Sequence, residues 1–308
     1  MANILFVRFD MNLPKSFSFN GPTQLAPAKS ALLALMLIVT MHCLGCAPRT
    51  EQIIAHITSR RAPALAEWER KHGSMSHARR SAEYGSALVL VGAGPVEVRG
   101  PHRISISFRD GPTRRSGTAT CLSDDGYYLT AAHLVSGVQP QDRVQVVFFG
   151  EQVTHVDARV VWIGDENYGM DLAILQAPGL GATPLAWEHE DEIQLGVPML
   201  SHGFSNAQPR GTTPFTSGRI ADVRTSRDPE GRAWSLIISD IPLAPGDSGG
   251  PVVSEHGKLI GIGIGGGWTC ARGVFGVVFE VDLQTEVCRP SGEFIEGLVE
   301  ADRRAHGG

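Results

Sequence analysis

Residues 245–267 read PGDSGGPVVSEHGKLIGIGIGGG, and this stretch separates two kinds of fold. In its first part, glycine and proline residues surround one carboxylate, Asp247, and one hydroxyl, Ser248. Its second part holds two β-type segments around an EHGK turn and shows no helical periodicity. Because a reactive serine in an α/β fold lies on a turn between a strand and a helix, the segment after Ser248 argues for β-structure.

The same β pattern recurs along most of the chain. Short segments of β-branched and aromatic residues, separated by Gly, Asp, Pro and Asn, run from Ala87 to Leu283; examples are ALVLVG, RISISF, RVQVVFFG and GVFGVVFEV. Short strands at this spacing, without amphipathic helices between them, predict an all-β barrel or sandwich. The 308 residues suit one ordinary globular domain, or two small ones, with extensions.

The charge balance limits the class of partner. The chain carries 27 basic and 32 acidic residues, which gives a formal net charge of −5. A nucleic-acid-binding surface needs an excess of Lys and Arg to neutralise phosphates. Nucleic acid is therefore not an expected partner.

The order of histidine, acid and serine along the chain limits the class of serine hydrolase that the sequence fits. GDSGG satisfies the G-x-S-x-G pattern of α/β-hydrolases, but that fold needs an acid and then a histidine after the serine, and only His256 and His306 follow Ser248. The other route places the histidine first and the acid second. His133 ends the segment GYYLTAAH, and Asp171 opens DLAIL, where a buried carboxylate needs a donor such as a histidine N–H.

The segments TAAH, DLAIL and GDSGGP, in this order, resemble the three catalytic segments of the chymotrypsin-like (trypsin-like) serine peptidases. The run SDIPLAPGDSGGPVV resembles the bacterial Do/HtrA-like branch, whose additional peptide-binding domains are not expected here. The resemblance covers Ala87 to Leu283. It implies an all-β fold of two six-stranded antiparallel β-barrels with the active site between them.

The residue types fit the chemistry of a serine peptidase. Ser248 needs a base to become a nucleophile, and His133 can accept its proton and later return it to the leaving amine. Asp171 would hold the imidazole in the correct tautomer; Asp165 and Glu166 are weaker candidates for this role. Gly246 has no Cβ, so its N–H and that of Ser248 can face the cleft and bind an oxyanion.

The expected function is that of a serine endopeptidase, which hydrolyses peptide bonds in protein or peptide substrates through an acyl-enzyme intermediate. No metal or cofactor is expected. One alternative is a catalytically latent protein that keeps the peptidase fold for binding or as a scaffold. A second alternative is an esterase or acyl transferase on the same fold.

Three positions are candidates for substrate binding. In the resembled family, the residue six positions before the serine lies at the base of the specificity pocket, and here it is Pro242. The opposite wall is expected from GIGIGGG, where Gly263 and Gly265 leave space. An uncharged pocket favours small or medium apolar side chains, unless Trp268 or Arg272 from the next loop enters it.

The N-terminus predicts export. Lys29 precedes an apolar run from Ala31 to Cys46, which is shorter than the about 20 residues of a membrane span and typical of a secretory signal. The run ends in LGC, which looks like the end of a bacterial lipoprotein signal and makes Cys46 a candidate lipidation site. The expected location is the periplasm or cell envelope, where a lipid on that cysteine would anchor the chain to the membrane. A retained membrane anchor is the competing interpretation.

The chain is therefore divided into four parts. Residues 1–46 form the export segment, and residues 47–85 a spacer with one short helix over Pro63–Lys71. Residues 86–288 form the peptidase domain. Residues 289–308 form a C-terminal tail in which one helix can be accommodated.

The remaining cysteines leave two alternatives open. If Cys46 is lipidated, Cys121, Cys270 and Cys288 stay with the folded part, and three cysteines form at most one internal disulfide. One alternative is a bond between Cys270 and Cys288. The other is three free, buried thiols.

Overall fold

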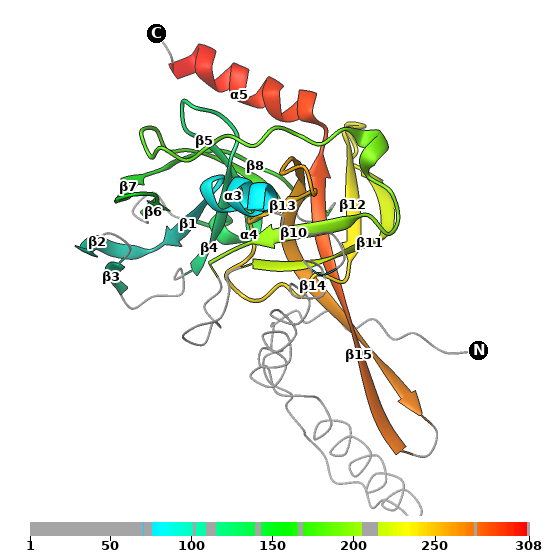
Figure 1. The fold of residues 1–308 in the computed structure, drawn as a ribbon. Coiled ribbons are helices and arrows are strands. Elements are labelled where there is room, and N and C mark those ends of the chain that lie inside the picture. The colour runs from blue at the N-terminus through cyan, green and yellow to red at the C-terminus, as the bar shows by residue number, and fades with distance from the viewer. Residues whose placement is uncertain are drawn as a thin grey trace, which may run out of the picture. The chain divides into compact units, whose positions relative to one another are not determined.

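The computed structural model describes residue 70 and residues 76–100, 103–108, 115–138, 143–165, 169–204, 215–273 and 276–306. Most of these residues lie in two β bodies, a seven-stranded sheet and a closed six-stranded barrel (Figure 1). The largest cluster of buried side chains includes Leu172 from the first body and Leu200 from the second. The two bodies are thus packed on one continuous core.

The first body is an antiparallel sheet with the strand order β7-β6-β1-β4-β5-β9-β8. Strand β1, which lies between β6 and β4, has the sequence SALVLV and is buried at all six positions, as expected for a strand covered on both faces. The hairpin of β2 and β3 forms a separate two-stranded sheet. The strands span β1 Ser86–Val91, β2 Ala93–Gly100, β3 Arg103–Phe108, β4 Arg115–Cys121, β5 Tyr127–Thr130, β6 Val144–Phe149, β7 Val153–Asp157, β8 Arg159–Ile163 and β9 Ala173–Gln176.

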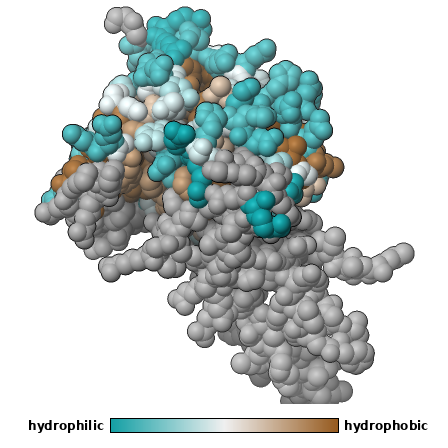
Figure 2. Space-filling view, viewed as in Figure 1, coloured by the Kyte–Doolittle hydropathy of each residue, from teal (hydrophilic) through white to brown (hydrophobic). Residues whose placement is uncertain are grey.

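The second body is a closed barrel with the strand order β10-β11-β12-β15-β14-β13. Beyond the barrel, β14 and β15 continue as a long two-stranded hairpin (Figure 1). On the face of the molecule in Figure 2, hydrophilic side chains cover most of the described surface, with smaller hydrophobic areas between them. The strands span β10 Pro198–His202, β11 Phe215–Arg227, β12 Ala233–Ser239, β13 Pro251–Val253, β14 Leu259–Gly273 and β15 Gly276–Pro290.

The expected all-β, chymotrypsin-like arrangement is confirmed, with one difference in the first body. The second body is the expected six-stranded barrel, whereas the first has seven strands and ends at β7 and β8 without closing among the described residues. Closure needs both edge strands to pair with each other. Here β7 pairs with β6, and β8 pairs with β9.

Helix α3, Ser76–Tyr84, corrects the expected spacer. Residues 76–84 were expected to belong to a linker up to residue 85. Ala78 and Ala82 are completely buried and belong to the main core, and the helix lies against β10 and β13. Small side chains allow this close approach, so residues 76–84 belong to the folded domain.

Helix α5, Gly292–His306, is the helix that the C-terminal segment was expected to accommodate, but it packs on the domain and is not a separate tail. Ile295 and Val299 are buried in the main core. Asp302 accepts hydrogen bonds from the Tyr127 hydroxyl of β5 (2.8 Å) and from the Arg159 Nη1 of β8 (2.8 Å), and Figure 1 shows the helix alongside these strands. The helix is therefore part of the domain and covers an edge of the first sheet.

Several expected features lie outside the described residues: the export segment 1–46, the lipidation site Cys46 and most of the helix over Pro63–Lys71. Of that helix, only Arg70 is described, and it is helical. Within the described ranges, no helix is both long enough and apolar enough to cross a membrane. Two further short helical segments are α4, Ala132–Val135, and a 3-10 turn, Glu190–Glu192.

The strand register decides between the two cysteine alternatives where the structure describes them. Cys288 lies opposite Ile262 on β14, whereas Cys270 lies opposite Val281 on β15. The partner of Cys270 is therefore seven residues from Cys288 along β15, about 23 Å at 3.3 Å per residue, and a disulfide requires Cα atoms within about 7 Å. Cys288 is a free, buried thiol, as is Cys121.

Candidate active site

His133 lies where strand β5 turns into the short helix α4. Tyr128 and Leu129 are buried and anchor the strand in the core. The guanidinium of Arg115 donates to the carbonyl oxygens of His133 (2.6 Å) and Ser136 (2.7 Å), two acceptors at the end of a helix of one turn. These bonds fix the backbone of His133, while its side chain remains 37% exposed.

Asp171 contacts His133 through both carboxylate oxygens. Its Oδ1 accepts the main-chain N–H of His133 (2.8 Å), and its Oδ2 lies 2.7 Å from the ring Nδ1. Because a carboxylate only accepts hydrogen bonds, the proton is assigned to Nδ1. The ring is thus oriented with Nε2 as the nitrogen that can accept another proton, and Asp171, not the alternative Asp165, is its partner.

Ser248 lies in a tight loop that precedes β13. The N–H of Asp247 donates to the carbonyl of Ala244 (2.9 Å), and the N–H of Gly250 donates to the carbonyl of Asp247 (2.9 Å). Asp247 is 1% exposed, and its Oδ2 accepts the N–H of Ala244 (2.8 Å). These local bonds hold the backbone on both sides of Ser248.

Two glycines of this loop have positive φ angles. Gly246 has a φ of +101° and Gly249 a φ of +87°, in the region that favours glycine. A Cβ on Gly249 would overlap the carbonyl oxygen of Thr118. Within the described part of the chain, the N–H groups of Gly246 and Ser248 donate no hydrogen bond. They are therefore free to bind an anionic oxygen.

Thr118 of strand β4 holds the loop in this conformation, and the sequence analysis did not identify it. Its hydroxyl donates to the carbonyl of Gly246 (2.8 Å) and accepts the N–H of Phe204 (3.0 Å). Its own N–H donates to the carbonyl of Ser248 (2.8 Å). In sequence, Thr118 is an ordinary strand threonine, since these partners are 86 residues or more away.

The loop of Ser248 and the segment of His133 come together at Gly117. A Cβ on Gly117 would overlap the Leu134 side chain and lie 3.0 Å from the carbonyl oxygen of Ser248. Among the described residues, no hydrogen bond joins the Ser248 hydroxyl to the His133 ring. Such bonds are commonly long before substrate binds.

Comparison with known proteins relates the part of the chain that holds these residues to a protein family. The family model of the trypsin-like peptidase domain matches residues 117–262, a range that contains His133, Asp171 and Ser248. Residues 117–262, just under half of the chain, thus match the trypsin-like peptidase domain. The resemblance drawn from TAAH, DLAIL and GDSGGP is thereby confirmed.

Two relatives of this part of the chain are bacterial serine proteases. A probable periplasmic serine endoprotease DegP-like of Ectopseudomonas mendocina (strain ymp) is 24% identical over 168 residues, which are 54% of this chain and 33% of the relative. The serine protease Do-like HtrA of Lactobacillus helveticus is 30% identical over 139 residues, 44% of this chain and 32% of the relative. The chain thus spans about a third of the length of these relatives.

Among solved structures, the HtrA-type protease AlgW with decapeptide is 23% identical to this chain. The alignment covers 74% of this chain and 68% of that one, with a TM-score of 0.48.

The expected specificity residues of the peptidase domain lie around strand β14. The carbonyl of Gly263 accepts the N–H of Gly249 (2.7 Å), so this part of β14 runs beside the loop of Ser248. A Cβ on Gly263 would lie 2.7 Å from Leu243, which fills the space that the glycine leaves. Gly265 has no neighbour within 4 Å of such a Cβ, and Pro242 is buried.

Leu243 is a specificity candidate that the sequence analysis missed. The sequence points to the residue six positions before Ser248, which is Pro242, but it is the following residue, Leu243, that lies against Gly263. The side chains of Trp268 and Arg272 and all of Glu166 lie outside the described residues. The described wall is uncharged.

Proposed function

We propose that this chain is a serine endopeptidase with Ser248 as nucleophile, His133 as general base and Asp171 as the residue that orients the base. The observation that carries the proposal is the two-point contact between Asp171 and His133, because it directs Nε2 away from the carboxylate. The match to the trypsin-like peptidase domain over all three residues supports it.

The proposed reaction has two halves. His133 Nε2 takes the proton of the Ser248 hydroxyl while Oγ bonds to the substrate carbonyl carbon, and the N–H groups of Gly246 and Ser248 stabilise the oxyanion. Nε2 then gives the proton to the leaving amine as the C–N bond breaks, which leaves an acyl-enzyme. Water adds to the ester with the same base, and the carboxylate product leaves Ser248 free again.

The proposed substrates are proteins or peptides with a small or medium apolar side chain before the cleaved bond. Pro242, Leu243, Gly263 and Gly265 carry no charge, so a Lys or Arg in this pocket would lose water without gaining a partner. Leu243 reaches Gly263 and reduces the depth of the pocket, which disfavours large aromatic side chains.

Labelling with a fluorescent fluorophosphonate tests the catalytic proposal, because this reagent reacts with activated serines. The wild-type chain should be labelled, and the Ser248→Ala and His133→Ala variants should not. An unlabelled wild type with a normal circular dichroism spectrum would favour the latent binding or scaffold protein. A labelled chain that hydrolyses esters but no peptide library would favour an esterase or acyl transferase.

We further propose that the chain is exported to the periplasm or cell envelope and that Cys46 carries a lipid. The apolar run that ends in LGC supports export and lipidation, and the names of the DegP-like relatives support a periplasmic location. Metabolic labelling with an alkyne-tagged fatty acid should mark the wild type and not the Cys46→Ala variant. Equal labelling of both would exclude this lipidation site.

A further inference from the structure

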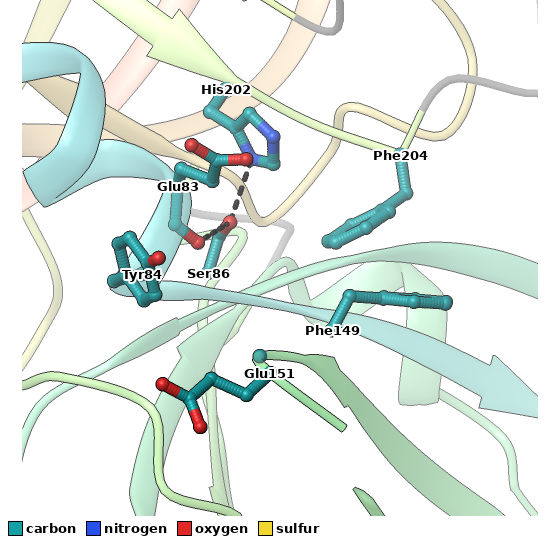
Figure 3. A pocket seen from close by; sticks show the side chains of 8 residues that line it. Glu83, Tyr84, Ser86, Phe149, Glu151, His202 and Phe204 are labelled. Atoms are coloured by element: carbon teal, nitrogen blue, oxygen red, sulfur yellow. Dashed lines mark hydrogen bonds between the residues drawn. The ribbon is translucent and has the colours of Figure 1, made fainter. Parts of the chain in front are cut away.

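A pocket outside the candidate active site lies where helix α3, the first sheet and the barrel meet. Its volume is 510 Å³, within the range of about 300 to 1,000 Å³ that is typical of small-ligand sites. The end of α3, the start of β1, the turn between β6 and β7 and the end of β10 line it (Figure 3). None of its lining residues belongs to the proposed catalytic or specificity set.

Aromatic side chains form the apolar part of the pocket. The rings of Phe149 and Phe204 lie 5.5 Å apart between centroids with an interplanar angle of 34°. Tyr84 lines the pocket opposite these rings in Figure 3 and is 45% exposed. Aromatic faces carry partial negative charge and attract cations, most often the guanidinium of Arg or the ammonium of Lys.

Two carboxylates give the pocket a negative charge. Glu83 and Glu151 both line it and are exposed, and neither forms a salt bridge with a described residue. No Lys or Arg is among the described residues that line it. Even a protonated His202 would offset only one of the two negative charges. A cation therefore fits this pocket better than a neutral or anionic group.

The buried end of the pocket is held by a defined hydrogen-bond chain. The Ser86 hydroxyl lies 2.6 Å from His202 Nδ1 and 3.1 Å from the carbonyl oxygen of Glu83 (Figure 3). Because a carbonyl only accepts, Ser86 donates to Glu83 and accepts the Nδ1–H of His202. The Ser86 hydroxyl proton is thus used in the hydrogen bond to the Glu83 carbonyl, and Ser86 is not positioned as a second nucleophile. The pocket is arranged for binding.

We propose that this pocket binds the cationic side chain of an arginine or lysine of a partner peptide. The aliphatic stem would lie between the Phe149–Phe204 pair and Tyr84, and the charged end would reach Glu83 and Glu151. The two carboxylates select the charge, while the aromatic side chains cover the stem. The substrate pocket proposed above prefers uncharged side chains, so the two sites differ in the residue type that they accept.

Isothermal titration calorimetry with two matched peptides tests this site. The probes are acetyl-Gly-Arg-Gly-amide and acetyl-Gly-citrulline-Gly-amide, which have nearly the same shape and differ in charge. The full chain carries Ser248→Ala, so that no probe is cleaved and the result does not depend on the proposed catalysis. The arginine peptide should bind at least about tenfold more tightly than the citrulline peptide, since two charge contacts are lost.

Substitutions locate the binding. The double variant Glu83→Gln/Glu151→Gln should weaken binding of the arginine peptide about tenfold and remove its advantage over citrulline. The matched control Glu293→Gln/Glu296→Gln removes two exposed carboxylates from helix α5 and should leave the affinity unchanged. Equal affinity for both peptides, or a wild-type affinity in the Glu83/Glu151 double variant with unchanged melting temperature, would overturn the proposal.

Discussion

His133 and Asp171 are joined twice, by the ring Nδ1–H to Oδ2 at 2.7 Å and by the main-chain N–H to Oδ1 at 2.8 Å. The second bond ties the carboxylate to the backbone, so the position of Asp171 does not depend on the rotamer of the histidine. A single hydrogen bond would allow the carboxylate to rotate about it. The pair is thus held in one orientation before any substrate arrives.

The first prediction concerns this pair. Asp171→Asn keeps the size of the side chain, but its amide NH₂ group cannot accept from both N–H groups of His133, so the other ring tautomer becomes favoured. The rate of fluorophosphonate labelling should fall by about 10⁴-fold with the fold retained. Asp165→Asn, at the alternative acid, should label at the wild-type rate. Equal labelling of the Asp171 variant would exclude Asp171 as the orienting residue.

The second prediction concerns Thr118. Thr118→Val removes the hydroxyl that joins the Phe204 N–H to the Gly246 carbonyl and leaves two polar groups without this partner. The free energy of unfolding should fall by about 2 kcal/mol. The labelling rate should fall by about tenfold or more, because the Gly246 peptide loses its restraint.

Thr154→Val is the control for this variant, since the Thr154 hydroxyl also donates to a main-chain carbonyl, that of Leu180, at 2.8 Å. It should cost about 1 kcal/mol of stability without slowing the labelling. If both threonine variants lose stability but neither loses labelling, the bridge at Thr118 has a structural role alone.

The third prediction compares two glycines. Gly249→Ala places a Cβ at a φ of +87° and against the carbonyl of Thr118, so the variant should lose about 3 kcal/mol or more of stability. Gly265→Ala meets no atom within 4 Å and should melt close to the wild-type temperature. Thermal unfolding followed by circular dichroism measures both. A Gly249→Ala variant as stable as wild type would show that the loop adopts another conformation.

The fourth prediction concerns Asp302, whose side chain is 8% exposed. Hydrogen bonds from Arg159 lower the pKa of Asp302 to about 2, below its ordinary value of about 3.9. A lowered pKa contributes stability that is present above about pH 4 and is lost as the pH falls through about 2. Asp302→Asn should therefore lower the free energy of unfolding by about 1 to 2 kcal/mol at pH 7.

Urea unfolding at pH 7, pH 4 and pH 2.5 measures this contribution. The difference between wild type and Asp302→Asn should shrink as the pH decreases from 4 to 2.5. Asp222→Asn removes one partner of the exposed pair with Arg224 and should leave stability unchanged. A constant difference at all three pH values would assign the effect to packing and not to charge.

Several features of the fold were readable from local sequence. Alternating and fully apolar segments predict strands because side chains on a strand alternate between faces. The glycines around Ser248 predict a backbone that side chains would obstruct, and the structure adds that Gly246 and Gly249 have positive φ angles. The order of His133, Asp171 and Ser248 predicts the site because each lies in a segment with its own recognisable pattern.

Other features depend on contacts between distant residues. Helix α3 has the composition of a linker and is recognised as part of the domain only where Ala78 and Ala82 meet the core. In the sequence, nothing distinguishes Asp302 from the other acidic residues. Its role depends on the hydrogen bonds from Tyr127 and Arg159, which are distant in the chain. The closure of one body and not the other depends on which edge strands pair.

The sequence by itself therefore determined the strand content, the catalytic candidates and the glycine positions, since each follows from steric and polar properties of neighbouring residues. The tertiary structure alone decided that Thr118 restrains Gly246, that Leu243 faces Gly263, and that two glutamates and three aromatic side chains share one pocket. These relationships arise when strands and loops that are far apart in the chain pack together, and no local pattern encodes them.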